Sequence, residues 1–185
     1  MNTPNKITIF RITLVPVFLL VYTLNMPFRY FISLAVFAAA SLTDAIDGHL
    51  ARKNNQITDF GKFLDPVADK MLVTAGLLAL LSEEICNVWI VMIILIREFL
   101  ISSFRMIAAA QGVVIPANIY GKIKTVVQMV SFFVILLLLG INSVNALPFS
   151  ITLTADILLG VSALIGVISA VIYLKEGLNK ISFTK

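Results

Sequence analysis

Six long apolar segments dominate the chain and set its fold class. About 20 helical residues span the ~30 Å hydrocarbon core of a bilayer. The segments of about this length cover residues 7–25, 29–51, 60–81, 87–110, 119–140 and 151–174. Backbone groups in lipid must be paired within helices or closed barrels, and continuous apolar runs are typical of helices. The sequence therefore predicts an all-α integral membrane protein, a bundle of six transmembrane helices.

The composition supports this class and excludes others. Of the residues, 59% are hydrophobic and 13% are charged, whereas a soluble domain carries about a quarter charged residues. An ordinary soluble enzyme and a disordered chain are therefore excluded, and the single cysteine, Cys86, excludes a disulfide scaffold. The segments between the spans are short and polar, without a linker or a repeat. We predict a single domain over residues 1–185.

The basic residues predict the orientation of the spans. Ten of them fall near one set of helix ends: Lys6, Arg52, Lys53, Lys62, Arg105, Lys122, Lys124, Lys175, Lys180 and Lys185. The opposite set has only Arg29, and the 82–87 turn carries Glu83 and Glu84. The positive-inside rule then places both termini in the cytoplasm. The net charge of +4 is explained by cytoplasmic loops and anionic headgroups, not nucleic acid. We expect a multi-pass protein of the plasma membrane.

Aspartates in the second and third spans are the anomaly. A carboxylate at the centre of a membrane helix costs ~2.5–3.5 kcal/mol on insertion scales. Yet one stretch contains five of them: Asp44, Asp47, Asp59, Asp65 and Asp69. Asp59 lies in the loop, where capping of a helix N-terminus explains it. The other four require a functional reason.

Their spacing supplies that reason. One face of the second expected helix carries Asp44, Asp47, Gly48 and Ala51. One face of the third carries Gly61, Asp65 and Asp69. At 1.5 Å per residue, Asp44 lies ~12 Å from the Arg52 end of its helix and Asp69 ~12 Å beyond Gly61. In an antiparallel pair these carboxylates converge at matching depth, where cations must neutralise them. Hard oxygen ligands favour Mg²⁺ or Mn²⁺, and four carboxylates suit two ions ~3.5–4 Å apart.

Two structural interpretations compete with a metal site. The carboxylates could form buried ion pairs with Arg52, Lys62 and Lys70, which suits one aspartate but explains all four poorly. Gly48 and Ala51 could serve only close helix packing. The second interpretation is compatible with a ligand site beside the small residues.

The aspartate stretch resembles a family signature. It reads Asp44-x2-Asp47-Gly48-x2-Ala51-Arg52-x8-Gly61-x3-Asp65-x3-Asp69. This is similar to the signature of the CDP-alcohol phosphatidyltransferase family, without a departure at its eight fixed positions. The resemblance implies an enzyme that moves a phosphatidyl group from a CDP-linked lipid, CDP-diacylglycerol, to an alcohol and releases CMP. The six-span layout with cytoplasmic termini and an active site facing the cytoplasm agrees with that family, whose members are usually homodimers.

The resemblance also implies roles for individual residues. The metal ligands would be Asp44, Asp47, Asp65 and Asp69, with Asp69 also the general base. The CDP site would be lined by Asp44, Asp47, Gly48, Ala51, Arg52, Gly61 and Asp65. Without a nucleophile elbow or a Cys/His pair, a covalent intermediate is disfavoured. We expect His49 to be a polar residue at headgroup level and Cys86 to be inert.

Further pieces resemble the family members whose acceptor is glycerol 3-phosphate. They are Asn2-x-Pro4-Asn5-x2-Thr8-x2-Arg11-x4-Pro16, the run Arg97-Glu98-Phe99-Leu100 with Arg105, and Gly121-Lys122-x-Lys124-Thr125. An anionic acceptor needs cationic partners. We expect Arg105 and Lys122 to bind the acceptor phosphate, with Lys124 as the second choice. Alternatively, the lysines could anchor the protein at anionic lipid headgroups. For Arg97, the alternative is a buried ion pair with Glu98 or with a residue of another helix.

Two other functions stay open. The same chemistry could use inositol phosphate or another polar alcohol as the acceptor. A cation- or proton-coupled carrier would also place carboxylates in membrane helices, but it predicts repeats and broken helices in both halves. The second half has no comparable cluster, because Asp156 is alone in residues 95–185.

Overall fold

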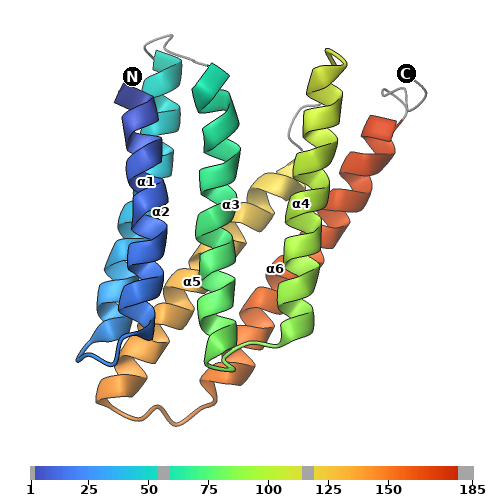
Figure 1. Cartoon of the computed structure of the whole chain (residues 1–185). Coiled ribbons are helices and arrows are strands. Elements are labelled where there is room, and N and C mark those ends of the chain that lie inside the picture. The colour runs from blue at the N-terminus through green and yellow to red at the C-terminus, as the bar shows by residue number, and fades with distance from the viewer. Residues whose placement is uncertain (1–2, 54–58, 114–118, 179–185) are drawn as a thin grey trace. The chain divides into compact units, whose positions relative to one another are not determined.

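The computed structural model describes the backbone of residues 3–53, 59–113 and 119–178, and the side chains of residues 7–43, 67–113 and 119–177. Over these ranges the chain is helical, without a strand (Figure 1). The helices are α1 (Thr3–Thr23), α2 (Arg29–Lys53), α3 (Asp59–Ser82), α4 (Val88–Ala110), α5 (Ile119–Val144) and α6 (Ile151–Leu178). All six predicted helices are confirmed, and each is continuous over the described residues.

One difference from the predicted boundaries is at the end of α5. The sequence predicted that the span beginning at residue 119 ends at Gly140, whereas α5 continues to Val144. A Cβ atom at Gly140 would lie 2.9 Å from the Phe31 ring. This glycine therefore permits close packing of α5 on α2 within the helix and does not end it.

Local signals explain both ends of α4. Asn87 caps the first turn, because its side chain accepts a hydrogen bond from the backbone N–H of Trp89 at 2.9 Å. At the other end Gly112 has φ +71°, and Val113 N–H donates to the carbonyl of Ala108 at 2.9 Å. This is the glycine-terminated geometry that commonly satisfies the last carbonyls of a helix.

The chain falls into two compact units with interleaved segments. Unit 1 contains Met1–Glu83 and Phe133–Ser150, and unit 2 contains Glu84–Phe132 and Ile151–Lys185. The helix α5 runs through both units, so neither is a continuous stretch of chain. The single domain predicted over residues 1–185 stays a prediction.

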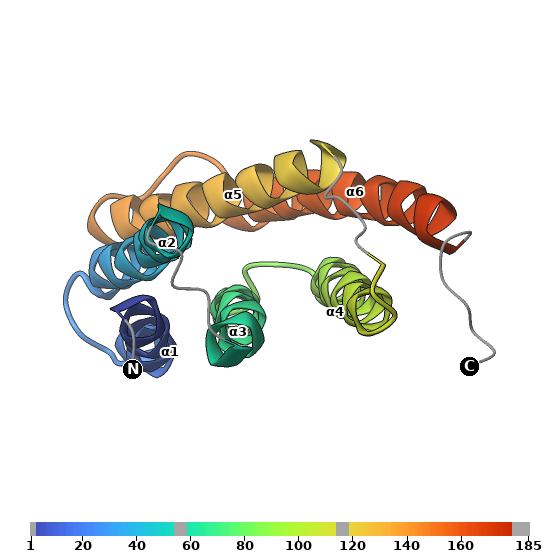
Figure 2. The ribbon, with the colours of Figure 1, turned by 90° about the horizontal axis from the view of Figure 1, so that it is seen from above.

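In unit 1, α1 packs against both α2 and α3 (Figure 2). The buried stripe of α1 contains Val15, Phe18 and Tyr22, spaced three or four residues apart. The Phe18 ring lies 5.7 Å from the ring of Phe37 in α2, and the Tyr22 ring lies 5.6 Å from that of Tyr30. These contacts fix the antiparallel register of α1 against α2.

In unit 2, α4 packs against α6. Their shared core contains Ile101, Phe104 and Ala108 of α4 and Tyr173 of α6. The Phe104 and Tyr173 rings meet edge to face, with centroids 6.0 Å apart and an interplanar angle of 78°. This packing places the charged residues of α4 next to the middle of α6.

Within the described residues, α5 and α6 are long and apolar enough to cross a membrane, with mean hydropathies of 2.2 and 2.5. Shorter apolar stretches lie in α1 and α2, at Ile7–Thr23 and Arg29–Thr43. Large apolar side chains are exposed along the helices, including Trp89 at 73% and Leu164 at 62%. This surface suits contact with lipid. Six spans and the orientation of the termini stay predictions.

Candidate functional site

The buried stripe of α2 leads to the aspartate signature. Ser33, Phe37 and Ala40 are all fully buried, at spacings of four and three residues. Continuing this register by four and seven residues from Ala40 gives Asp44 and Asp47. The two signature positions therefore continue the heptad-like spacing of this stripe along the sequence, and their side chains lie outside the described residues.

The buried stripe of α3 reaches the same end of unit 1. Leu80, Leu77 and Val73 are at most 5% exposed, and the next position four residues earlier is Asp69. The Asp69 side chain is 40% exposed, with the ammonium of Lys70 3.7 Å from its carboxylate. Asp69 thus stands where the apolar stripe ends and a carboxylate becomes accessible. The Lys70 contact fits the predicted ion-pair alternative for this one aspartate.

A charged residue of α1 lies at the level of the aspartate signature. Arg11 is fully buried, seven residues before Phe18. Asp44 is seven residues after Phe37, the partner of Phe18 in α2. The antiparallel register therefore brings Arg11 level with Asp44. Sequence analysis did not select Arg11 as a site residue, although a charged residue inside an apolar span is itself a signal.

Of the residues predicted to bind metal or CDP, Asp69 is the one whose side chain the structure describes. The others, Asp44, Asp47, Gly48, Ala51, Arg52, Gly61 and Asp65, lie outside the residues described at this level. Among the described residues there is no group of three or more acidic, histidine or cysteine side chains suited to a metal. The convergence of the four carboxylates and the CDP-binding roles stay predictions.

The three predicted acceptor residues all lie in unit 2 and differ in exposure. Arg105 of α4 and Lys122 of α5 are exposed, and Arg105 interacts with the hydroxyl of Tyr173. Lys124 of α5 is buried, with 3% of its side chain exposed. Arg105 and Lys122 are therefore accessible to a water-soluble anion, whereas Lys124 belongs to an internal charge cluster.

That cluster joins three helices. Glu98 of α4 accepts hydrogen bonds from the ammonium of Lys124 and, at 3.0 Å, from Nη1 of Arg97. Arg97 also donates from Nε to the carbonyl of Gly166 at 3.2 Å and from Nη2 to the hydroxyl of Ser169 at 3.1 Å. The predicted ion pair between Arg97 and Glu98 is confirmed. Its connection to Lys124 and α6 was not predicted.

Two lone groups, Asp156 of α6 and Cys86 in the turn between α3 and α4, have structural roles. Asp156 of α6 accepts a hydrogen bond from the backbone N–H of Asn87 at 2.7 Å. Cys86 is buried, and burial and the charge of Asp156 raise the pKa of its thiol to about 11. A thiol held neutral in this way fits the expected inert residue.

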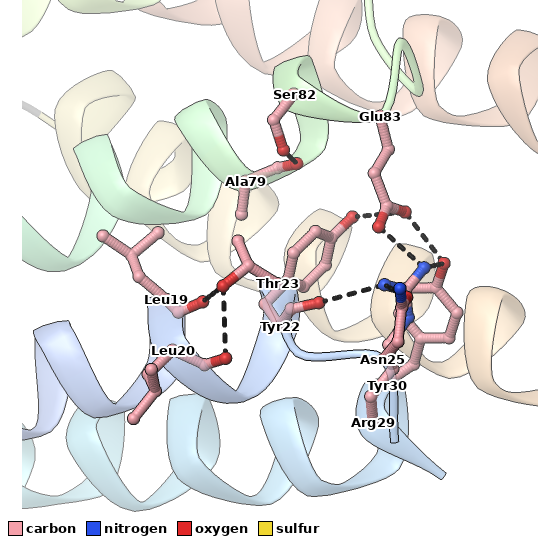
Figure 3. Close-up of polar contacts among 10 residues, drawn as sticks. All are labelled: Leu19, Leu20, Tyr22, Thr23, Asn25, Arg29, Tyr30, Ala79, Ser82 and Glu83. Carbon is pink, nitrogen blue, oxygen red and sulfur yellow. Dashed lines mark hydrogen bonds and ion pairs between the residues drawn. The ribbon is translucent and has the colours of Figure 1, made fainter. Parts of the chain in front are cut away.

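At the end of unit 1 remote from the signature, four side chains form a polar network (Figure 3). Arg29 pairs with Glu83 at 2.8 Å and donates to the Tyr30 hydroxyl at 2.6 Å. The hydroxyls of Tyr30 and Tyr22 donate to Glu83 at 2.8 and 3.3 Å. The network connects α1, α2 and the end of α3, and so joins the two helices that carry the signature to α1.

Comparison with known proteins identifies the class of transferases to which this helical chain with its aspartate signature belongs. The model of the family described as CDP-alcohol phosphatidyltransferase matches residues 1–169. The chain belongs to this family, which confirms the resemblance seen in the signature.

Several curated relatives carry one name, CDP-diacylglycerol–glycerol-3-phosphate 3-phosphatidyltransferase. The relative from Bacillus subtilis (strain 168) is 37% identical over 182 residues, 91% of each chain. That from Rickettsia bellii (strain RML369-C) is 37% identical over 174 residues, 94% of each chain. That from Wigglesworthia glossinidia brevipalpis is 42% identical over 141 residues, 74% of this chain and 77% of its own.

Proposed function

We propose that the protein transfers the phosphatidyl group of CDP-diacylglycerol to glycerol 3-phosphate, giving phosphatidylglycerophosphate and CMP. The observation that carries the proposal is the identity of 35–37% over at least 91% of the chain to relatives named for this reaction. The chain is then an enzyme of phospholipid biosynthesis. The carrier alternative predicts broken helices, and α1–α6 are continuous over the residues described.

The residues fit two divalent cations as cofactors. Asp44, Asp47, Asp65 and Asp69 supply carboxylate oxygens, the ligand type that Mg²⁺ and Mn²⁺ prefer. Val73, Leu77 and Leu80, which continue the Asp69 face along α3, are buried and apolar. Bound ions would neutralise the pyrophosphate and the charge that develops on the leaving CMP.

The remaining signature residues would bind the CDP moiety. Gly48, Ala51 and Gly61 leave room for a ligand close to the backbone, and Arg52 supplies positive charge for the pyrophosphate. The aspartates Asp44, Asp47 and Asp65 complete this site. Since these residues occupy the cytoplasmic halves of two helices in the proposed orientation, the active site faces the cytoplasm.

Transfer would be a direct displacement. The acceptor hydroxyl oxygen forms a bond to the phosphatidyl phosphorus, the bond from that phosphorus to the CMP oxygen breaks, and Asp69 takes the hydroxyl proton. The 40% exposure of the Asp69 side chain makes it accessible for this role. Asp69→Asn would therefore lower turnover while binding of CDP-diacylglycerol persists, and a phosphatidylated protein intermediate would not form.

Arg105, Lys122 and Lys124 would bind the acceptor phosphate. A phosphate monoester carries nearly two negative charges near neutral pH and needs cations beside it. The exposure of Arg105 and Lys122 suits entry of such a substrate from water. We further propose six membrane spans with both termini in the cytoplasm, a plasma-membrane location and a homodimer.

The experiment that tests the function is CMP release from labelled CDP-diacylglycerol by the purified protein in detergent. With glycerol 3-phosphate, we expect stoichiometric CMP and phosphatidylglycerophosphate. A carrier would release no CMP. Faster transfer to inositol phosphate or to unphosphorylated glycerol would contradict the acceptor assignment while leaving the reaction class intact.

A further inference from the structure

Two adjoining cavities lie at the end of unit 1 that carries the network of Arg29 and Glu83. Their volumes are about 430 and 390 Å³, within the ~300–1,000 Å³ typical of ligand sites. The turn between α1 and α2 and the last turn of α5 line both of them, and several side chains are shared. We call the two cavities together the Arg29 site, which includes Asn25, Met26, Arg29, Tyr30, Asn142 and Ser143.

Both amide side chains of the Arg29 site have their oxygen occupied and their nitrogen left over. Oδ1 of Asn25 accepts a hydrogen bond from Nη1 of Arg29 at 3.4 Å, and Oδ1 of Asn142 accepts from the backbone N–H of Leu147 at 3.0 Å. Each amide then offers its NH₂ group as a donor. Among the described residues, neither NH₂ group makes a hydrogen bond, and Nε of Arg29 makes none either. These donors suit an anion with several acceptor oxygens.

The donors are accessible, and the lining contains no carboxylate that would compete for them. Asn25 and Asn142 are exposed, and the Arg29 side chain is 22% exposed. Glu83, which pairs with Arg29, is not among the residues that line either cavity. Its oxygens accept instead from Arg29 and from the hydroxyls of Tyr22 and Tyr30 (Figure 3). An anion could therefore approach the site from the side away from Glu83.

An apolar groove runs on from the Arg29 site between α2 and α5. The ring of Phe28, which lines the second cavity, lies 6.4 Å from the ring of Phe31, which lines the groove. The groove has a volume of about 390 Å³ and follows α2 for about two turns. Its lining is apolar throughout and includes Phe31, Leu34 and Ala38 of α2 and Phe133 and Leu137 of α5. The site thus has a polar end and an apolar end.

We propose that the Arg29 site and the groove bind a phospholipid. The phosphate accepts hydrogen bonds from Asn25, Arg29 and Asn142, and one acyl chain lies in the groove. A free anion would use the donors but leave the apolar groove uncovered, whereas a phospholipid matches both ends. Because this end of unit 1 lies opposite the aspartate signature, the lipid occupies the leaflet remote from the active site. The inference rests on the proposed membrane spans and not on the proposed reaction.

The test is native mass spectrometry of the purified protein in a neutral detergent. The probes are dioleoyl phosphatidylglycerol and dioleoylglycerol, which share their acyl chains and differ in the phosphate headgroup. The wild type should bind the phospholipid at least ~10-fold more tightly, since contacts to an ionised group contribute this much. Asn142→Asp keeps the oxygen that accepts from Leu147 but replaces the donor with a negative charge. It should weaken binding of the phospholipid roughly tenfold and leave binding of dioleoylglycerol unchanged.

The matched control for the charge is Asn145→Asp. Asn145 is exposed just after α5 and outside the lining of both cavities, so its change should alter the binding of either lipid less than about threefold. If Asn142→Asp does not fold, Asn25→Asp is the second variant, because it keeps the oxygen that accepts from Arg29. Equal binding of the two lipids by the wild type, or phospholipid binding unaffected by the aspartate variants, would overturn the phosphate contact.

A second arm tests the acyl chain. Ala35 is exposed and lines the groove, so Ala35→Phe should fill the groove and weaken binding of both lipids. The chain-free headgroup, glycerophosphoglycerol, should not displace the phospholipid at equal concentration. Unchanged lipid binding by Ala35→Phe, or displacement by the headgroup alone, would overturn the assignment to a lipid.

A kinetic readout separates this site from the active site. Asn142 lies at the end of unit 1 opposite the signature, so Asn142→Asp should change the KM for CDP-diacylglycerol less than about twofold. A rise in this KM that parallels the loss of phospholipid binding would show that the lipid lost is the substrate, and would overturn the inference. A wild type that forms no phosphatidylglycerophosphate but binds the phospholipid as expected would contradict the proposed function alone.

Discussion

The guanidinium of Arg29 lies 2.8 Å from the carboxylate of Glu83, which joins the first turn of α2 to the residue that follows α3. Arg29 is the only basic residue that the sequence assigns to its set of helix ends. Its pairing with Glu83 offsets that charge locally, and the hydroxyls of Tyr22 and Tyr30 complete the coordination of the carboxylate. The network therefore links α1, α2 and the residue after α3 at the end of unit 1 opposite the aspartate signature.

Removing the Glu83 charge should destabilise the protein. Both side chains of the ion pair are about a quarter exposed, and two tyrosine bonds are weakened with it, so Glu83→Gln is expected to lower the free energy of unfolding by about 1–2 kcal/mol. Thermal unfolding in detergent measures this as a fall in Tm. The matched control is Glu84→Gln, since Glu84 is exposed and its change should leave Tm nearly unaltered. Equal shifts for the two variants would contradict the role of the network.

Cys86 should resist alkylation in the folded protein. Its pKa is raised to about 11, because burial and the charge of Asp156 disfavour the thiolate. At a pH of about 8 the thiolate fraction is then ~0.1%, and reaction with iodoacetamide should quicken only as the pH rises toward that pKa. Mass spectrometry of the modified protein gives the rate, with the denatured protein as control. Equal rates for the folded and denatured protein at pH 8 would refute this environment.

Arg105 should contribute to binding of the acceptor and not of the lipid. An exposed guanidinium that contacts the phosphate of glycerol 3-phosphate contributes ~1.5–3 kcal/mol, so Arg105→Ala should raise the KM for that substrate ~10–100-fold. Lys122→Ala should behave similarly. Steady-state kinetics with each substrate varied in turn measures the effect, and Lys175→Ala, exposed on α6, is the near-neutral control. An Arg105→Ala effect confined to CDP-diacylglycerol would show that the pocket is assigned wrongly.

Arg11 should be essential for the stability of unit 1. We expect the fully buried Arg11 guanidinium to compensate acidic charge at the signature end of unit 1, so Arg11→Met should reduce the free energy of unfolding by about 3–5 kcal/mol. Arg11→Lys keeps the charge and should lose less. Denaturant unfolding followed by circular dichroism compares the variants. A Met variant as stable as the wild type would mean that the guanidinium compensates no buried charge.

The sequence predicted the helices better than their contacts. Apolar runs of membrane length gave all six helices, because length and hydropathy are local properties. The end of α5 was predicted wrongly at Gly140, since glycine as a helix end and glycine as a packing site look alike without the Phe31 ring beside it. The link between Glu98 and Lys124 was beyond reach because the two residues are 26 positions apart on different helices. The ion pair of Arg97 with Glu98 could be predicted because these two residues are adjacent in the sequence.

The most direct test of the account compares metal dependence in the wild type and Asp44→Asn. The measurement is formation of phosphatidylglycerophosphate from labelled CDP-diacylglycerol and glycerol 3-phosphate, with Mg²⁺ or Mn²⁺ added back after EDTA. The account predicts product with the wild type and metal, none in EDTA, and none with Asp44→Asn at any metal concentration. Full activity in EDTA, or wild-type turnover by Asp44→Asn, would contradict a metal-assisted transfer at the aspartate signature.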